Sequence, residues 1–426
     1  MIPASILKIN YNNVKLVHYW EPIFKKNNLS IKKAGEKFIQ LLVQSASRLT
    51  SDKKKYGVFL SGGHDSRLVI SSFKNQIESF TVSYQKNFES KCAKDISNSL
   101  GFKNTFIKLE KNHFEKNFKD IIRICGAQYT FIDALFINLD KKYFNEIDYV
   151  FHGHGLDYLF QGMYLPAKYY KIFGSPIFFK KIQFEYNNVY DEFINNISFR
   201  NKDFDLRKVI KKNYLESFNK NLKSEIKSLV MDEKFSSFTK YDIWEYLIIH
   251  SLGRHYSRAN IISKLTNVKE RTLIFDNDLF SFYLSLNIKQ RINSDIVRYA
   301  ISNINDKIGK IPTGNWGFPA KDGPLIKTMK LILRKLLRII SGNQKFKAPT
   351  AEDRTWPDRE TYLQKNSFLR NEIELLFKDK EFILLLDKLD WKLLNNYKID
   401  WMNNKKGGAK LLMSLISIYK FIKLTE

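Results

Sequence analysis

Residues 56–70 read YGVFLSGGHDSRLVI, and this stretch contains the pattern from which the fold can be predicted. A short apolar run over residues 56–60 comes first, then Gly62 and Gly63, and apolar residues resume at Leu68. An apolar run of this length is typical of a buried strand, and paired glycines let the backbone turn sharply and approach a ligand closely. We therefore predict a strand, a tight turn and a helix.

The alternation of strand and helix continues on both sides of this stretch. Ser30 can cap a helix over residues 31–49, where apolar residues recur at helical spacing. Further strands are predicted at residues 79–83, 105–109 and 149–152. Further helices are predicted at residues 89–100, ending at Gly101, and 112–125. This order predicts an α/β fold, a parallel sheet with helices on both faces, whose ligands gather at the carboxyl ends of the strands.

Strand signals fade after about Pro166, and the remainder is predicted to be mainly helical. We predict three parts: an N-terminal extension and helix over residues 1–54, a nucleotide-binding core over residues 55–200, and a mainly helical part over residues 201–426 that completes the domain. One helix, at residues 325–340, carries basic residues every three or four positions among Leu and Ile. It could lie on a membrane surface, or it could pack its apolar side on the core.

The bulk composition limits the classes of function. The chain has 71 Lys and Arg against 44 Asp and Glu, a formal net charge of +27. This charge favours anionic partners, but abundant Lys, Asn, Ile and Phe are also what an AT-rich genome would encode. Cys92 and Cys125 form no CxxC pair, so neither a usual zinc site nor a disulfide-stapled secreted fold is expected. The start resembles no signal peptide and no long apolar run is present, so a cytoplasmic protein without a transmembrane segment is expected.

The turn over residues 61–66 has the chemistry of a phosphate site. Successive backbone N–H groups and the amino end of the following helix attract phosphate oxygens, and Ser61 and Ser66 add hydroxyl donors. Asp65 would repel phosphate, unless Mg²⁺ bridges the two, because this ion prefers oxygen ligands. The Walker A loop is excluded, since it requires a lysine that is lacking here.

A second acidic glycine turn follows the strand predicted at residues 149–152. Residues 151–162 read FHGHGLDYLFQG. Because carboxyl ends of parallel strands share one edge of the sheet, Asp157 and Asp65 are expected on the same side.

These two turns together resemble the synthetase half of asparagine synthetases. Residues 61–66 resemble the SGGxDS loop of the ATP-pyrophosphatase superfamily, and residues 152–162 resemble the family's SGEGADELFGG segment. The resemblance implies an adenine nucleotide alpha hydrolase-like fold, the PP-loop fold, in which ATP is cleaved between its α and β phosphates. It implies that Asp65 and Asp157 are catalytic and pair around Mg²⁺ and pyrophosphate. His154, at a position where the family contacts the acyl-adenylate, is predicted as a third catalytic residue. The ATP-binding residues that the resemblance implies are Leu60, Ser61, Gly62, Gly63, Asp65, Ser66, Val82, His152 and Gly153.

Three positions depart from the family's pattern. His154 replaces a glutamate, and could act as a general base or simply bond to the backbone of its turn. Tyr158 replaces a second glutamate. Asn315 stands where the family's lysine stabilises acyl transfer, and the nearby Lys310 could substitute for it.

Three functions fit these features. The first is an asparagine synthetase-like ligase that adenylates a small-molecule carboxylate and forms an amide; stand-alone members suggest substrates such as a uronic acid of surface polysaccharide. No glutaminase domain is recognised before residues 17–22, which resemble the family's joining segment, so the amine is expected to be ammonia, the product of a separate glutaminase, or an amine of the substrate. The second is a tRNA-lysidine synthetase, which the basic charge fits, although the second turn makes nucleic acid an unlikely partner. The third is a nucleotide-binding homologue that has lost catalysis.

Overall fold

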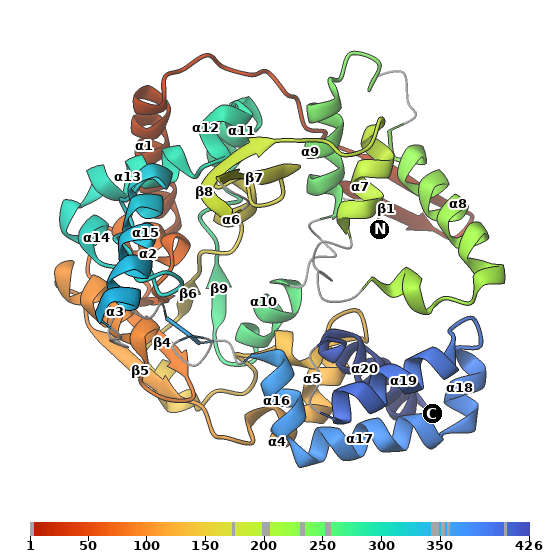
Figure 1. Cartoon of the computed structure of the whole chain (residues 1–426). Coiled ribbons are helices and arrows are strands. Elements are labelled where there is room, and N and C mark those ends of the chain that lie inside the picture. The colour runs from red at the N-terminus through yellow and green to blue at the C-terminus, as the bar shows by residue number, and fades with distance from the viewer. Residues whose placement is uncertain are drawn as a thin grey trace.

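The computed structural model describes residues 4–172, 175–197, 205–230, 235–251, 257–341, 349–350, 354–355, 358–403 and 407–426 (Figure 1). At its centre is a five-stranded parallel sheet in the order β5-β4-β3-β6-β9. The strands are β3 (Tyr56–Phe59), β4 (Glu78–Ser83), β5 (Asn104–Lys108), β6 (Tyr149–Phe151) and β9 (Lys269–Arg271). The predicted parallel α/β fold is confirmed.

The fifth strand was missed by the sequence reasoning. β9 has the sequence KER, which contains no apolar run, and it pairs only with β6 at the edge of the sheet. The Arg271 guanidinium lies 3.9 Å from the ring centre of Tyr149, a cation–π contact between the two strands. This strand belongs to the sheet although it follows residue 200, so the boundary drawn there stays a prediction.

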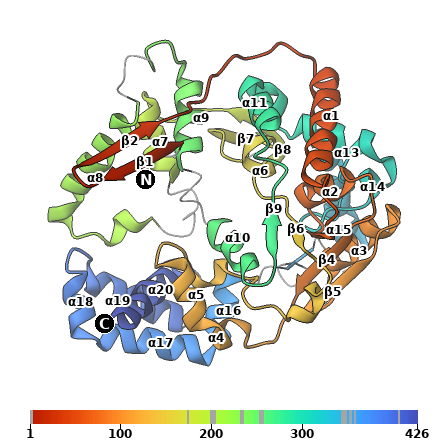
Figure 2. The same ribbon diagram turned by 180° about the vertical axis from the view of Figure 1, so that it is seen from behind.

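Each face of the sheet contributes to its own hydrophobic core. Side chains of a strand alternate between faces, so Val58 and Phe151 lie in one cluster while Phe59, Phe80 and Val150 lie in the other. The first cluster also contains residues of helices between residues 31 and 99, 156 and 159, and 277 and 304, and the second contains residues of helices between residues 113 and 125 and of the C-terminal helices. The prediction that helices cover both faces is therefore confirmed (Figures 1 and 2).

The predicted helices at residues 31–49, after the first glycine turn and at residues 89–100 are confirmed, whereas the helices at residues 156–159 and 189–197 were not predicted. The helices of the first half are α1 (Ile31–Leu49), α2 (His64–Ser71), α3 (Phe88–Ser99), α4 (His113–Lys116), α5 (Phe118–Cys125), α6 (Leu156–Leu159) and α7 (Val189–Ile197). Ser30 caps α1 as predicted, since its hydroxyl accepts a bond from the Lys33 amide at 3.3 Å. The single helix predicted over residues 112–125 is wrong, because Asn117 leaves the helical conformation and its side chain donates to the His113 carbonyl at 2.8 Å.

The second half of the chain is mainly helical, as predicted. Its helices are α8 (Lys212–Ser228), α9 (Lys240–Ser251), α10 (Ser257–Leu265), α11 (Asn277–Ser285), α12 (Ile288–Arg291), α13 (Asp295–Ile304), α14 (Asp306–Lys310), α15 (Pro324–Ser341), α16 (Arg359–Lys365), α17 (Ser367–Lys378), α18 (Lys380–Leu385), α19 (Trp391–Met402) and α20 (Ala409–Thr425). Within the described ranges, no helix is long and apolar enough to cross a membrane.

Two antiparallel hairpins were not predicted. They pair β1 (Ser5–Asn10) with β2 (Asn13–His18) and β7 (Ala167–Ile172) with β8 (Ser175–Ile182). Both lie outside the central sheet. In β7–β8, mixed aromatic and lysine residues gave no alternating pattern, because neither strand has one buried face and one exposed face.

Candidate nucleotide site

Serine hydroxyl groups accept hydrogen bonds from backbone amides within the first glycine turn, residues 61–66. The Ser61 amide donates to Ser66 Oγ at 3.0 Å, and the Gly63 amide donates to Ser61 Oγ at 3.2 Å. Helix α2 begins directly afterwards, with Gly63 as its N-cap. The turn therefore presents hydroxyl groups and the positive end of an eight-residue helix at the carboxyl edge of β3.

A buried arginine holds this turn from behind. Arg67 is fully buried, and its guanidinium donates to four carbonyl oxygens: Gly62 at 3.2 Å, Ile308 at 2.6 Å, Ile311 at 2.7 Å and Pro312 at 2.9 Å. Burial lowers the pKa of Arg67 to about 10, so the group stays charged at neutral pH. Arg67 thus joins the phosphate turn to residues from a part of the chain far away in sequence.

The second glycine turn touches the first. A Cβ placed on Gly153 would lie 2.6 Å from Asp65 Cβ and 2.7 Å from the Ser66 nitrogen, distances that a real Cβ does not reach. Gly155 adopts a φ of +106°, a conformation that favours glycine, and directly precedes α6. The spacing of the two turns therefore depends on glycine at residue 153.

This contact brings the two predicted carboxylates together. Asp65 lies near Asp157, and burial and the charge of Asp157 raise the pKa of Asp65 well above its ordinary value. The Gln161 amide donates to Asp65, and the Gln161 oxygen lies 3.2 Å from His64 Nδ1. Two neighbouring carboxylates repel each other unless a cation is present, and carboxylate oxygens are ligands that Mg²⁺ prefers, so the donor set fits this ion. Among the described residues, no group of three or more His, Cys, Asp or Glu side chains is placed to hold a metal ion.

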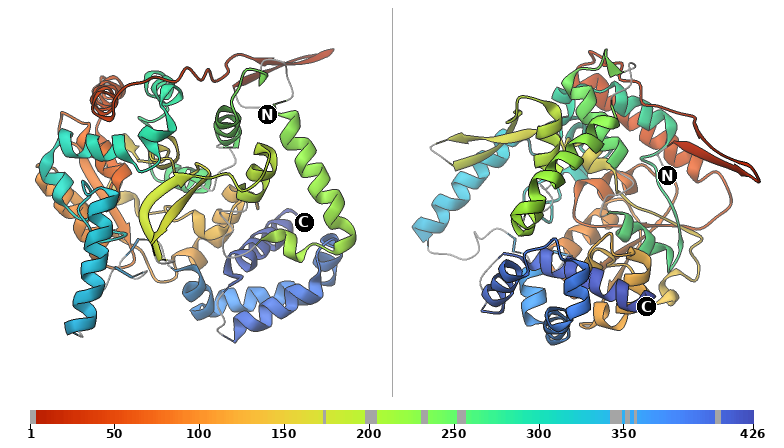
Figure 3. Two further views of the ribbon diagram at one scale, coloured as in Figure 1. Left: turned by 45° about the horizontal axis from the view of Figure 1, so that its top comes forward. Right: turned by 90° about the vertical axis from the view of Figure 1, so that its right-hand side faces the viewer.

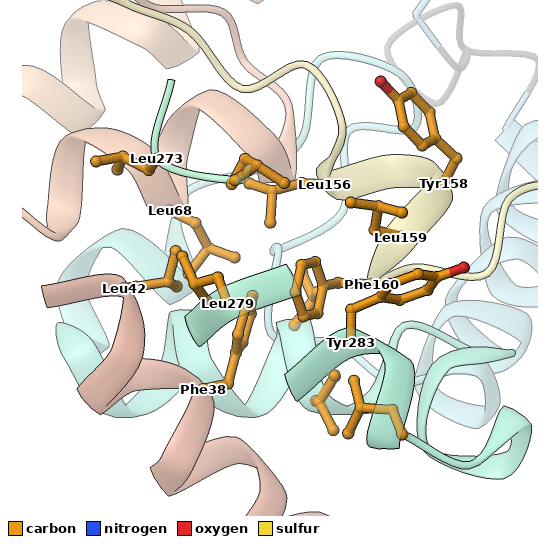
Figure 4. Packing of buried hydrophobic residues seen from close by; sticks show 14 of the residues in the cluster. Phe38, Leu42, Leu68, Leu156, Tyr158, Leu159, Phe160, Leu273, Leu279 and Tyr283 are labelled. Atoms are coloured by element: carbon orange, nitrogen blue, oxygen red, sulfur yellow. The ribbon is translucent and has the colours of Figure 1, made fainter. Parts of the chain in front are cut away.

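Helix α6, which carries Asp157, is anchored in the first hydrophobic core. Leu156, Leu159 and Phe160 are fully buried, and Phe160 stacks on Phe38 of α1 with ring centres 4.5 Å apart (Figure 4). Tyr158, which replaces a family glutamate, stacks on Tyr164 instead. Asp157 is therefore carried by a short helix whose apolar side chains leave it little freedom to move.

The backbone groups of Val82, a predicted ATP-binding residue, point to the side of β4 on which β3 lies. The side chain of Val82 is buried. Along β4, the backbone N–H and C=O groups of successive residues point in turn towards β3 and towards β5. Phe80 accepts from the Leu60 amide of the β3 side at 2.8 Å, so Val82, two residues further, points to the same side. There β3 has already ended at Phe59, which leaves the Val82 N–H and C=O facing the space beside the turn.

His152 and His154 belong to a buried network of titratable groups. His154 Nε2 lies 3.0 Å from Lys264 Nζ and also contacts Asn260 Oδ1, while the His154 amide donates to His152 Nδ1 at 3.2 Å. His152 Nε2 in turn lies 3.3 Å from Glu270 of β9. Burial lowers the pKa of Lys264 and raises that of Glu270, and burial with the nearby Lys264 charge lowers the pKa of His152. His154 therefore contacts other side chains rather than only its own turn.

A pocket of about 200 Å³ lies against the amino end of α2. Its lining includes three basic side chains and no Asp or Glu among the described residues, a composition that suits an anion. Asn315 lies in its wall, but Lys310 does not substitute there, since it is exposed and pairs with Asp306 at 2.6 Å. The lining residues are Gly63, His64, Gln161, Tyr169, Phe178, Lys180, Ile292, Asn293, Ser294, Arg298, Thr313, Asn315, Trp316, Pro324 and Lys327.

The sequence reasoning missed several residues of this site. Gln161 lies inside the second turn, yet nothing in its local pattern indicates that it reaches Asp65. Lys264, Arg298 and Lys327 lie on helices more than a hundred residues beyond that turn. Only the folded chain brings them to the edge of the sheet.

A parallel sheet that carries a glycine-serine phosphate turn and a second acidic turn defines the PP-loop class of ATP-using proteins. The sequence profile of asparagine synthase matches residues 37–338, so the chain belongs to the asparagine synthase family and is of the ATP-dependent ligase type.

Similarity to individual proteins is low. No curated protein matches the chain significantly. A solved structure, the NH3-dependent NAD synthetase from Campylobacter jejuni subsp. jejuni NCTC 11168 in complex with the nitrate ion, is similar over 55% of this chain and 97% of its own, with 14% identity and a TM-score of 0.23.

Proposed function

We propose that the protein adenylates a small-molecule carboxylate with ATP and then forms an amide with ammonia or another amine. The observation that carries this proposal is the contact between the two glycine turns, which brings Asp65 and Asp157 together beside a turn suited to phosphate. Family membership supports the same class of chemistry.

In the first step, an oxygen of the substrate carboxylate attacks the α-phosphorus of ATP, and the bond to the β-phosphate breaks. Ser61, Ser66 and the amino end of α2 hold the phosphates, and the backbone of Val82 holds the adenine ring. Mg²⁺, when bound by Asp65 and Asp157, supplies positive charge that screens the phosphates from these carboxylates.

The departing pyrophosphate enters the basic pocket. Lys327 lines this pocket together with Gly63, and burial with the charges of Arg298 and Arg67 lowers the pKa of Lys327 to about 8. At neutral pH the ammonium is mostly charged, so an anion there gains a strong partner. Lys327 lines the same pocket as Asn315, the position at which the family's pattern has a lysine.

In the second step, the amine nitrogen attacks the acyl carbon and AMP leaves. The amine loses a proton, and His154 is the group that we propose accepts it. Lys264 and Asn260 orient the imidazole through its Nε2 atom, because both contact that atom. If His154→Ala left both adenylation and amide formation unchanged, the base role would be wrong.

The proposed substrate is a small molecule that carries a carboxylate. Aspartate and uronic acids, the latter in surface polysaccharide synthesis, are the substrate classes that the resemblance implies.

A screen for carboxylate-dependent ATP–pyrophosphate exchange tests the proposal. Aspartate and hexuronic acids are supplied singly with Mg²⁺, and pyrophosphate release is then measured with ammonium present. At least one acid should support exchange in the unmodified protein, and Asp157→Asn should abolish it. The absence of exchange in a broad screen, combined with normal ATP binding, would favour a homologue that has lost catalysis.

A further inference from the structure

Helix α15 exposes its apolar face. Met329, Ile332, Leu336, Ile339 and Ile340 follow the spacing of one helical face, and their exposed fractions are 62%, 52%, 50%, 75% and 81%. Helices on the surface of a globular protein ordinarily turn such a face towards the core. The packing interpretation of this segment is therefore wrong, and its apolar stripe has no partner within the described part of the chain.

The side of α15 that faces the protein is polar and basic. Thr328 Oγ1 accepts from the Phe178 amide of β8 at 3.2 Å, and Lys330 pairs with Asp322 at 2.7 Å. Arg334 donates to the Trp316 carbonyl at 3.0 Å. These contacts fix the rotation of the helix about its axis. The apolar stripe therefore points away from the protein.

The hairpin β7–β8 extends beside α15 on the same side of the molecule (Figure 3). Tyr169, Tyr170 and Ile172 are each about half exposed. Lys180 and Lys181 lie over the rings of Tyr169 and Tyr170, at 5.2 Å and 5.5 Å. Aromatic rings and long basic side chains of this kind suit the boundary between water and lipid, because each has an apolar body and a polar end.

All charged residues of α15, β7 and β8 are basic. Helix α15 contains five Lys and Arg, β7 and β8 contain four Lys, and none of the three elements contains Asp or Glu. The neighbouring carboxylates Glu185 and Asp322 pair with Lys168 and Lys330.

We propose that α15 and the β7–β8 hairpin form a docking surface for an anionic lipid membrane. The acyl-chain boundary would bury the apolar stripe, and anionic headgroups would meet Lys335 beside it and Arg338, which is exposed near the end of the helix. A second copy of the chain fits less well, because it would place the same cations opposite one another. Because α15 carries five basic residues along its length, the helix would lie in the membrane surface rather than cross the bilayer. This inference is independent of the proposed reaction.

Flotation of the full-length protein with vesicles tests the docking surface. One set contains phosphatidylcholine alone, and the other contains phosphatidylcholine with phosphatidylglycerol. We expect binding to the anionic set at low salt, weakened by added salt because the charges are screened. Lys335→Glu with Arg338→Glu should reduce binding by about tenfold or more. Ile332→Glu with Leu336→Glu should reduce it by a similar factor, since the apolar face no longer enters the lipid.

The matched control is Leu384→Glu with Leu385→Glu on α18, two leucines that are also mostly exposed. This control should bind like the unmodified protein. Equal binding to both vesicle sets, no binding to the anionic set, or no effect of the Ile332 and Leu336 pair would each overturn the proposal. So would an oligomer that does not bind lipid and that this pair converts to monomers, because the face would then join copies of the chain.

Discussion

Substitution of Gly153 by alanine perturbs the contact on which the site depends. The new methyl group would lie 2.7 Å from the Ser66 nitrogen, against 3.4 Å for ordinary contact, so the turns must separate by about 0.7 Å. The clash involves backbone atoms, which cannot rotate away as a flexible side chain would. The φ of Gly153 lies outside the left-handed region, so the cost is steric rather than conformational.

The expected result is a large loss of activity with a moderate loss of stability. Displacement of reacting groups by about 1 Å costs on the order of 10²-fold in rate. Overpacking of this kind destabilises a protein by about 1–3 kcal/mol. ATP–pyrophosphate exchange, measured well below the melting temperature of the variant, reports the first effect, and denaturant unfolding reports the second.

Gly309→Ala is the matched control. Its new methyl group would meet its nearest neighbours at 3.5 Å, within α14, so neither exchange nor stability should fall. If Gly153→Ala retained the exchange rate of Gly309→Ala, the two turns would not need their close contact, and the reasoning would be refuted.

Three further predictions concern the surroundings of the turns. Arg67→Met removes a donor from four carbonyl groups; those of Gly62 and Ile311 keep backbone donors, whereas those of Ile308 and Pro312 lose the donor that Arg67 supplies, so the free energy of unfolding should fall by about 3 kcal/mol in a denaturant titration. Lys327→Met should slow adenylation by about 10²-fold while Lys327→Arg restores part of the rate; equal rates in both variants would exclude a role for the charge. Burial lowers the pKa of His64 from 6.5 to about 3, so below pH 6.5 only the unfolded chain gains this proton, and stability falls as the pH drops towards 3. The melting temperature of His64→Gln should therefore fall less steeply between pH 7 and pH 4 than that of the unmodified protein. An unchanged slope would contradict a buried neutral imidazole.

The central part of the fold was predictable because its signals are local. Four strands were predicted from apolar runs, and the cap of α1 was predicted from Ser30. The strand β9 was missed because three polar residues become a strand only through their pairing with β6. The break at Asn117 depends on one side-chain bond to the backbone, which apolar periodicity does not reveal.

The same distinction separates the predicted from the missed residues of the site. The turns that carry Asp65 and Asp157 are recognisable in the sequence, although the roles assigned to their residues stay predictions. Arg67, Lys264 and Lys327 act on groups contributed by distant segments, so no local pattern marks them. The membrane interpretation of α15 was open in the sequence, because an amphipathic helix looks the same whether its apolar face is covered or exposed.

Binding of ATP, titrated with Mg²⁺ in a calorimeter without any carboxylate, tests the central claim most directly, since it needs neither the substrate nor a completed reaction. The unmodified protein and Glu381→Gln, a change at an exposed side chain, should bind ATP in a manner that depends on Mg²⁺. Asp65→Asn and Asp157→Asn should each lose this dependence. Unaltered magnesium-dependent binding in either aspartate variant would contradict the account.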